Sequence, residues 1–211
     1  MDTNIKEFIM DVTHKCIENG VTIYLGARTE YIQLEHDVED IPCSGYFSDD
    51  TDGDVPELAV AMGGGITKWL PVLVHESCHM DQWLEKSPLW TKHPMGDPAG
   101  LIDDWIHGMH FEQTIVDLIF AETIALELDC EKRSVKKIVD NHLPVHIGTY
   151  IQKANAYLMF YLYCKKHRKW TNTESSPYMD EISSQLPSDW YDTYDILPKE
   201  IEELFDTNLK F

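Results

Sequence analysis

The chain has 211 residues, 43% hydrophobic and 11% aromatic, which is enough to build the core of one folded domain. Its 37 acidic and 17 basic residues give a formal net charge of -20, which argues against a nucleic acid partner and against an anionic membrane surface. No apolar run approaches the roughly twenty residues of a membrane-spanning helix, and the first residues are acidic where a secretion signal is basic. We therefore expect a cytoplasmic protein.

The first third of the chain predicts one helix followed by short strands. Residues 2–19 have a helical apolar spacing, and Gly20 is a suitable stop. Strand-type runs follow at 21–25, 31–34, 44–47 and 57–62. Residues 49–54 form an acidic run without the ligand spacing of an EF-hand, so we expect a solvated loop there.

The segment 73–83 reads LVHESCHMDQW and contains the pattern H-E-x-x-H at His75, Glu76 and His79. Residues four apart lie on one face of a helix, so both imidazoles can bind one metal ion. Glu76 follows the first histidine and can reach a water held by that metal. The pattern is typical of a zinc-dependent hydrolase with two His ligands and a Glu general base. The alternative is a helix with two surface histidines and a solvated glutamate.

The rest of the chain predicts mainly helices. Residues 87–108 contain three prolines and two tryptophans and predict a long irregular segment that could cover or line a cleft. Helices are expected at 111–139 and 145–166, separated by a break at 141–144. The last forty or so residues predict loops with short helical pieces, including a final helix at 201–205. The five cysteines are scattered and never spaced as C-x-x-C, so we expect reduced thiols.

A catalytic zinc needs a third protein ligand, and the expected helix at 111–139 offers carboxylates for it. Glu122, Glu127 and Asp129 are the candidates, because carboxylates inside apolar stripes are costly unless they are paired or bound to a metal. The longer pattern H-E-x-x-H-x-x-G-x-x-H is absent, which excludes the metzincin class. A surface ion pair of Glu127 with Lys132 or Arg133 is the alternative.

A strand at 57–62, the H-E-x-x-H helix and a later helix with a glutamate together resemble the core of a zincin metallopeptidase of the gluzincin type. The resemblance covers residues 57–133. It implies an α+β fold, with a small mixed sheet in the N-terminal third, the motif helix, and a mostly helical C-terminal part. We expect one zincin-like domain over residues 1–211, with a C-terminal embellishment at 167–211. The strand at 57–62 would be the sheet edge that pairs with an extended peptide.

The resemblance also implies roles for single residues. Glu127 would be the third ligand and Glu131 the acceptor that holds a ligand histidine, because Glu127 is followed four residues later by an acidic side chain and Glu122 is not. A ligand histidine needs such an acceptor for its outer N–H. The oxyanion donor would be His142, His146 or Tyr150.

These expectations amount to a metallopeptidase with one zinc ion per chain, Glu76 as general base, and peptides or proteins as substrates. Two alternatives remain. One is a zincin-like binding protein without turnover. The other is a carboxylate-bridged di-iron protein, in which Glu76 and His79 would form one Glu-x-x-His pair. A second such pair is missing, and the strand-rich first third argues against that class. The substrate and the oligomeric state are not predicted.

Overall fold

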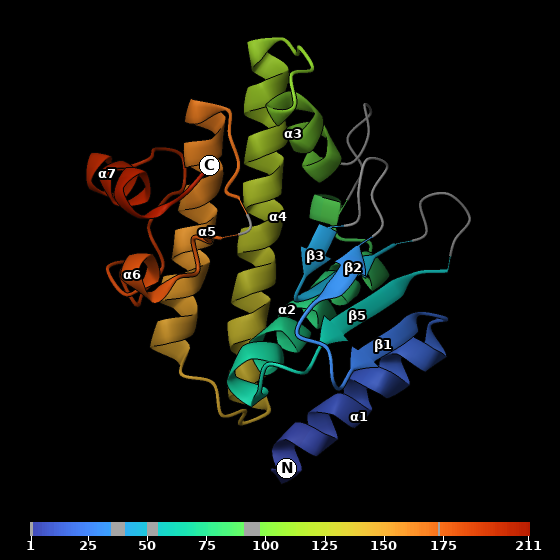
Figure 1. The fold of residues 1–211 in the computed structure, drawn as a ribbon. Coiled ribbons are helices and arrows are strands. Elements are labelled where there is room, and N and C mark those ends of the chain that lie inside the picture. Colours follow the sequence, from blue (N-terminus) through green and yellow to red (C-terminus); the bar gives the residue numbers. More distant parts are fainter. Residues whose placement is uncertain (1, 35–40, 50–54, 91–97, 173) are drawn as a thin grey trace. The chain divides into compact units, whose positions relative to one another are not determined.

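The computed structural model describes residues 2–34, 41–49, 55–90, 98–172 and 174–211 (Figure 1). It confirms an α+β chain in which a small mixed sheet in the N-terminal part precedes a mainly helical C-terminal region. By its internal contacts the chain divides into two compact units, Met1–Ser87 with Lys132–Val145, and Pro88–Glu131 with His146–Phe211. The single domain over residues 1–211, with a metal-site core at 57–133, stays a prediction.

The first unit opens with helix α1 (Thr3–Glu18), which confirms the helix expected at 2–19. Its buried face consists of Ile5, Phe8, Val12 and Cys16. The carboxylate of Asp2 caps the helix by accepting the Asn4 N–H at 2.9 Å. Gly20 has a φ of +70° just past the end of the helix, a conformation that glycine adopts at little cost.

Three strands of the first unit form the mixed sheet in the order β1 (Thr22–Gly26), β5 (Glu57–Ala61), β4 (Gly45–Ser48). Strand β1 runs parallel to β5, and β4 runs antiparallel to it. The prediction that residues 57–62 form an edge strand is therefore wrong. Both hydrogen-bonding sides of β5 are occupied, so β4 and β1 are the edges of this sheet among the described residues.

A second, two-stranded antiparallel sheet contains β2 (Ile32–Leu34) and β3 (Ile41–Cys43), with Ile32 opposite Cys43. Strand β3 was not among the strands expected from the sequence. Pro42 at its centre lacks a backbone N–H, which suits a strand at the edge of a sheet. Ile32 packs with Ala59 and Ala61 of β5. The acidic loop predicted at 49–54 lies, except for Asp49, outside the described residues.

Helix α2 (Ile66–Leu84) carries the H-E-x-x-H motif and contacts both β4 and β5. It begins well before the motif, so Pro71 lies in its second turn. A proline at this position cannot donate to the carbonyl four residues earlier, that of Thr67. The helix continues because its later turns are buried: Leu73, Val74, Cys78 and Met80 are fully covered.

The second unit is helical. It contains the short 3-10 turn η1 (Pro88–Trp90), α3 (Pro98–Ile106), the first part of α4 (Gln113–Asp140), α5 (Ile147–His167), α6 (Asp180–Ser183) and α7 (Lys199–Asn208). These bounds confirm the two long helices and the final helix. The prediction of an irregular segment at 87–108 is wrong for α3; residues 91–97 lie outside the described residues.

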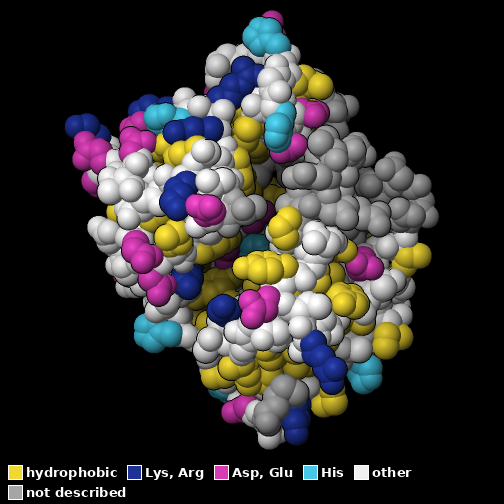
Figure 2. All heavy atoms as spheres, viewed as in Figure 1, with side chains coloured by type: hydrophobic (Ala, Val, Ile, Leu, Met, Phe, Trp, Pro, Cys, Tyr) yellow, Lys and Arg dark blue, Asp and Glu magenta, His cyan; other side chains and the backbone are white. Residues whose placement is uncertain are grey.

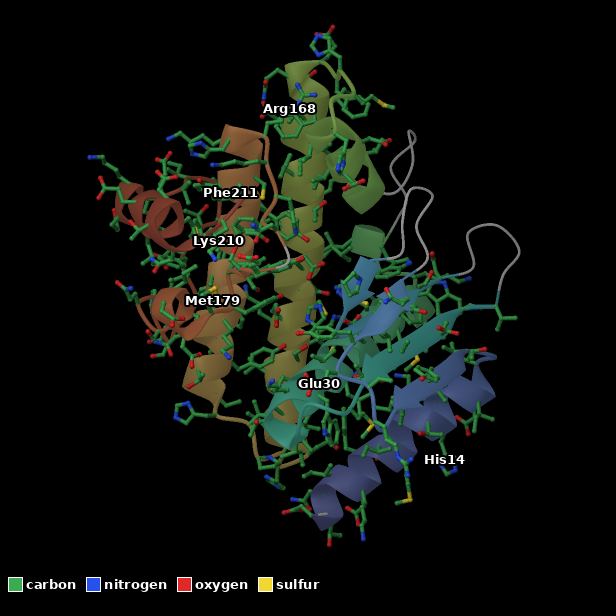
Figure 3. All side chains as sticks on the ribbon, in the orientation of Figure 1. His14, Glu30, Arg168, Met179, Lys210 and Phe211 are labelled. Atoms are coloured by element: carbon green, nitrogen blue, oxygen red, sulfur yellow. The ribbon has the colours of Figure 1, made fainter. Side chains whose placement is uncertain are left out.

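One aromatic and aliphatic core holds the second unit together, and α4 and α5 lie side by side in it (Figure 1). Phe120 of α4, Phe160 of α5 and Phe205 of α7 are completely buried in this core. At the C-terminal end of α5, the guanidinium of Arg168 donates to the carbonyl oxygens of Trp105 and Met109 (Figure 3).

The surface of the α5–α7 region carries acidic and basic side chains next to one another (Figure 2). Lys166 with Glu202 and Lys199 with Glu203 are two such ion pairs. No helix within the described residues is long and apolar enough to cross a membrane. All five cysteines are free thiols, as their number and spacing predict.

Candidate metal centre

One side of α2 is fixed by α1 and by the C-terminal part of α4, which belongs to the same unit. The Ser134 hydroxyl lies 3.5 Å from Cys78 Sγ, and Lys137 Nζ donates to the Ser77 hydroxyl at 2.8 Å. Cys16 Sγ of α1 lies 3.5 Å from Met80 Sδ. These contacts bury the residues between the motif positions, so the rotation of α2 about its axis is determined by packing.

Asp81 strengthens this attachment. Its carboxylate, 9% exposed as a residue, accepts from Lys15 Nζ at 2.6 Å and from Lys137 Nζ at 2.8 Å. A largely buried carboxylate is stable only when it is paired and hydrogen-bonded, and here two ammonium groups satisfy that need. The motif helix is therefore tied by ionic contacts to both neighbouring helices.

The other side of α2 packs on the edge strand β4, and Glu76 lies in this contact. A Cβ atom built on Gly45 would lie 2.5 Å from Val72 Cγ1 and 3.5 Å from Glu76 Cγ. Strand and helix approach so closely only because Gly45 has no side chain. Phe47 on the same strand packs against Trp83, with ring centroids 5.7 Å apart. The edge of the sheet thus lies beside the carboxylate predicted to act as general base.

The half-buried thiol of Cys43 lies close enough to Glu76 to be affected by its charge. Burial raises the pKa of Cys43 to about 11, and the negative charge of Glu76 adds to this effect. Cys43 ends β3 and Gly45 begins β4, so the ends of both strands lie near Glu76 of α2. Glu76 itself is only 9% exposed.

The two motif histidines converge as the sequence predicts. His75 Nε2 and His79 Nε2 are 3.1 Å apart, and the two rings are nearly perpendicular at 85°. Two nitrogens bound to one tetrahedral zinc at about 2.0–2.1 Å lie about 3.3 Å from each other. The pair therefore fits a shared metal ion.

The outer nitrogen of His79 also has a partner. Its Nδ1 lies 2.9 Å from Gln82 Oε1, and Gln82 is fully buried. An acceptor at this position holds a ligand imidazole in place. The sequence prediction gave this role to Glu131 and overlooked Gln82, although its place three residues after His79 on the same helix could have indicated it. The role of Glu131 stays a prediction.

A cysteine joins the two histidines. Among the described residues, the possible ligand atoms of His75, His79 and Cys130 all lie within 4.8 Å of one another, and this largely buried group can hold a metal ion. Cys130 was expected only to be a reduced thiol, because no two cysteines have C-x-x-C spacing. Imidazole and thiolate are both common zinc ligands.

Glu127 shares the α4 face of Cys130. Glu127, Cys130 and Ser134 follow one another at spacings of three and four, which place side chains on one helical face. At 100° per residue, Glu127 lies about 60° around the helix axis from Cys130, Glu122 about 80° and Asp129 about 100°. The Oε2 atom of Glu127 is buried, as is that of Glu131. Of the three predicted carboxylates, Glu127 therefore has the position closest to the Cys130 face.

Glu127 also acts on the tyrosines of α5 within the second unit. Burial raises the pKa of Tyr161, and Tyr157 and the charge of Glu127 raise it further. Tyr161 donates to the Tyr157 hydroxyl at 3.2 Å. The half-buried Glu127 carboxylate therefore lies close enough to Tyr161 for its charge to act on that hydroxyl.

The predicted oxyanion donors lie at the junction between α4 and α5. His142 is exposed and has a φ of +50°. His146 is exposed and caps α5, because its Nδ1 accepts the Thr149 N–H at 3.1 Å. Tyr150 is half-buried in the first turn of α5. The role of all three as oxyanion donors stays a prediction.

Comparison of the chain with models of protein families, with curated proteins and with solved structures found no match.

Proposed function

We propose that this chain is a zinc-dependent metallopeptidase of the zincin type. The observation that carries the proposal is the convergence of His75 Nε2 and His79 Nε2, 3.1 Å apart, on a buried helix. Glu76 follows His75 directly and lies against the edge strand β4. Two imidazoles with an adjacent carboxylate are the donor set and the general base of this class.

His75 and His79 would hold the zinc with Glu127 as third ligand, and Cys130 is the competing third ligand. Zinc, when bound, supplies a Lewis acid and a water of lowered pKa. The Glu76 carboxylate would act as the general base that accepts a proton from the attacking water, and then as the acid that donates it to the leaving amine. Strand β4, in place of β5, is the edge on which an extended peptide would form main-chain hydrogen bonds.

The test begins with the metal content of the purified protein, by mass spectrometry. We expect about one zinc per chain, lost in His75→Ala and in His79→Ala because each variant removes one of the ligands. His14→Ala is the matched control, because His14 is exposed on α1 and should leave the zinc content unchanged (Figure 3). Two irons per chain would favour the di-iron class instead.

Hydrolysis of a fluorogenic peptide library then tests the chemistry. Glu76→Gln should keep the zinc and lower the rate about 100-fold or more, because the general base is lost. A protein that binds zinc but cleaves no peptide would favour a zincin-like binding protein without turnover. An unchanged rate of hydrolysis in Glu76→Gln would favour it as well.

Two single substitutions distinguish the two candidates for the third ligand, Glu127 and Cys130. We expect Glu127→Ala to release the zinc and Cys130→Ser to retain it. The reverse result would assign a His-His-Cys site and remove Glu127 from the metal centre, while leaving the roles of His75 and His79 intact.

A further inference from the structure

We infer that Gln82 is a positioning residue that fixes the tautomer and the ring orientation of His79, and thereby sets the affinity of the site for its metal. This inference rests on the metal site of the proposed function. The contact that carries it is the one between His79 Nδ1 and Gln82 Oε1, at 2.9 Å. Gln82 has no exposed surface, so water does not compete for this contact.

The contact determines which ring nitrogen of His79 carries the proton. When the Gln82 carbonyl oxygen accepts, Nδ1 must donate its N–H, and Nε2 keeps its lone pair. That lone pair points towards His75 Nε2, 3.1 Å away. Two lone pairs at this distance repel each other, so the histidine pair holds either one shared proton or one cation. Gln82 thus prepares His79 for a metal ion before the ion arrives.

Gln82 can do this because its helix is held on the far side. Asp81, its neighbour in the chain, pairs with Lys15 and Lys137, and Cys78 lies against Ser134. The turn that contains His79 and Gln82 is therefore held in one orientation, and both side chains leave the helix in fixed directions. A supporting group fixed in this way keeps a ligand in its binding geometry at no further entropic cost.

The chemical nature of Gln82 makes the inference specific. An amide accepts the Nδ1 proton without adding negative charge, whereas a carboxylate would accept it and also strengthen the electron donation from His79 to a metal. Gln82→Glu should therefore keep or tighten metal binding. Gln82→Met keeps a side chain of similar length and removes the acceptor, so His79 loses its fixed tautomer.

The experiment is a zinc titration of the full chain against a chelating dye. We expect Gln82→Met to weaken zinc binding about 10- to 100-fold, the usual effect of losing such a support, and Gln82→Glu to bind at least as tightly as the original chain. Gln113→Met is the matched control, because Gln113 is an exposed glutamine on α4, and it should leave the affinity unchanged. Equal zinc affinity of the original chain and Gln82→Met, or equal weakening in Gln82→Glu, would overturn the inference.

A second measurement does not depend on the stability of the variants. Nitrogen-15 NMR of the metal-free original chain should show His79 with its proton on Nδ1. A proton on Nε2 would overturn the inference even if zinc binds. An original chain that binds no zinc but keeps the Nδ1 proton would refute the metal site of the proposed function while leaving the tautomer assignment intact.

Discussion

At the scale of single residues, Asp81 shows how a helix that carries a functional motif can be held by a side chain outside that motif. Its carboxylate meets Lys15 of α1 and Lys137 of α4, and Lys137 also reaches Ser77 of α2. The charges differ in exposure: the Lys15 side chain is 43% exposed and that of Lys137 only 22%. Lys137 therefore depends more strongly on Asp81, because less water is available to replace the carboxylate.

We predict that Asp81→Asn lowers the free energy of unfolding by about 3 kcal/mol, the lower end of the range for a broken buried ion pair, because Lys15 remains hydrated. Urea unfolding followed by circular dichroism measures the change. Asp140→Asn is the control, since its pair with Lys136 is exposed and should contribute less than about 1 kcal/mol. Equal losses in both variants would show that Asp81 has no special role.

The residue scale also shows what sequence reasoning could and could not find. His75, Glu76 and His79 were identified because a helix repeats every 3.6 residues, so the motif itself contains its geometry. Gln82 could have been found in the same way, because it lies three residues after His79 on the same helix. Cys130 could not, because its distance from the histidines depends on how α4 packs beside α2, and no spacing within either helix contains that information.

At the scale of elements, the positions of the strands could be predicted from the sequence, but their order in the sheet could not. The β-type runs at 21–25, 44–47 and 57–62 were found from composition, but composition does not give the order of strands in a sheet. Residues 57–62 were expected at the edge, whereas β5 is central because β1 and β4 pair with its two sides. Strand order is decided by contacts between distant parts of the chain, and Leu58 and Val60, both fully buried, are compatible with a central strand.

The contact between β4 and α2 has a steric requirement that can be tested. We predict that Gly45→Ala costs about 1–3 kcal/mol, because the added methyl group would lie 2.5 Å from Val72 Cγ1 and 2.9 Å from the Ala59 carbonyl oxygen. Urea unfolding measures the loss, and Val72→Ala in the same chain should recover part of it by making room. Gly64→Ala is the control, since its methyl group would meet only the flexible Lys68 side chain. Strict additivity of the Gly45 and Val72 changes would contradict this steric account.

At the scale of the whole molecule, charge is the dominant property. The formal net charge of -20 comes from 37 acidic and 17 basic residues, so even if every basic group were paired, many carboxylates would remain in excess. Local pairs such as Lys166 with Glu202 relieve only part of this repulsion. Excess charge of one sign keeps a protein soluble and destabilises its compact state. The balance between local attraction and overall repulsion can be shifted with salt.

We predict that sodium chloride stabilises this protein at low concentration. Raising the ionic strength from about 10 mM to about 150 mM shortens the screening length from about 30 Å to about 8 Å, which removes the long-range repulsion and spares the short contacts of Asp81. A gain of about 1 kcal/mol would raise the melting temperature of a chain of this size by about 2–4 °C. Differential scanning calorimetry measures the shift. Tetramethylammonium chloride at equal ionic strength should act equally, because screening does not depend on the identity of the cation. A falling melting temperature would mean that the ion pairs outweigh the net charge.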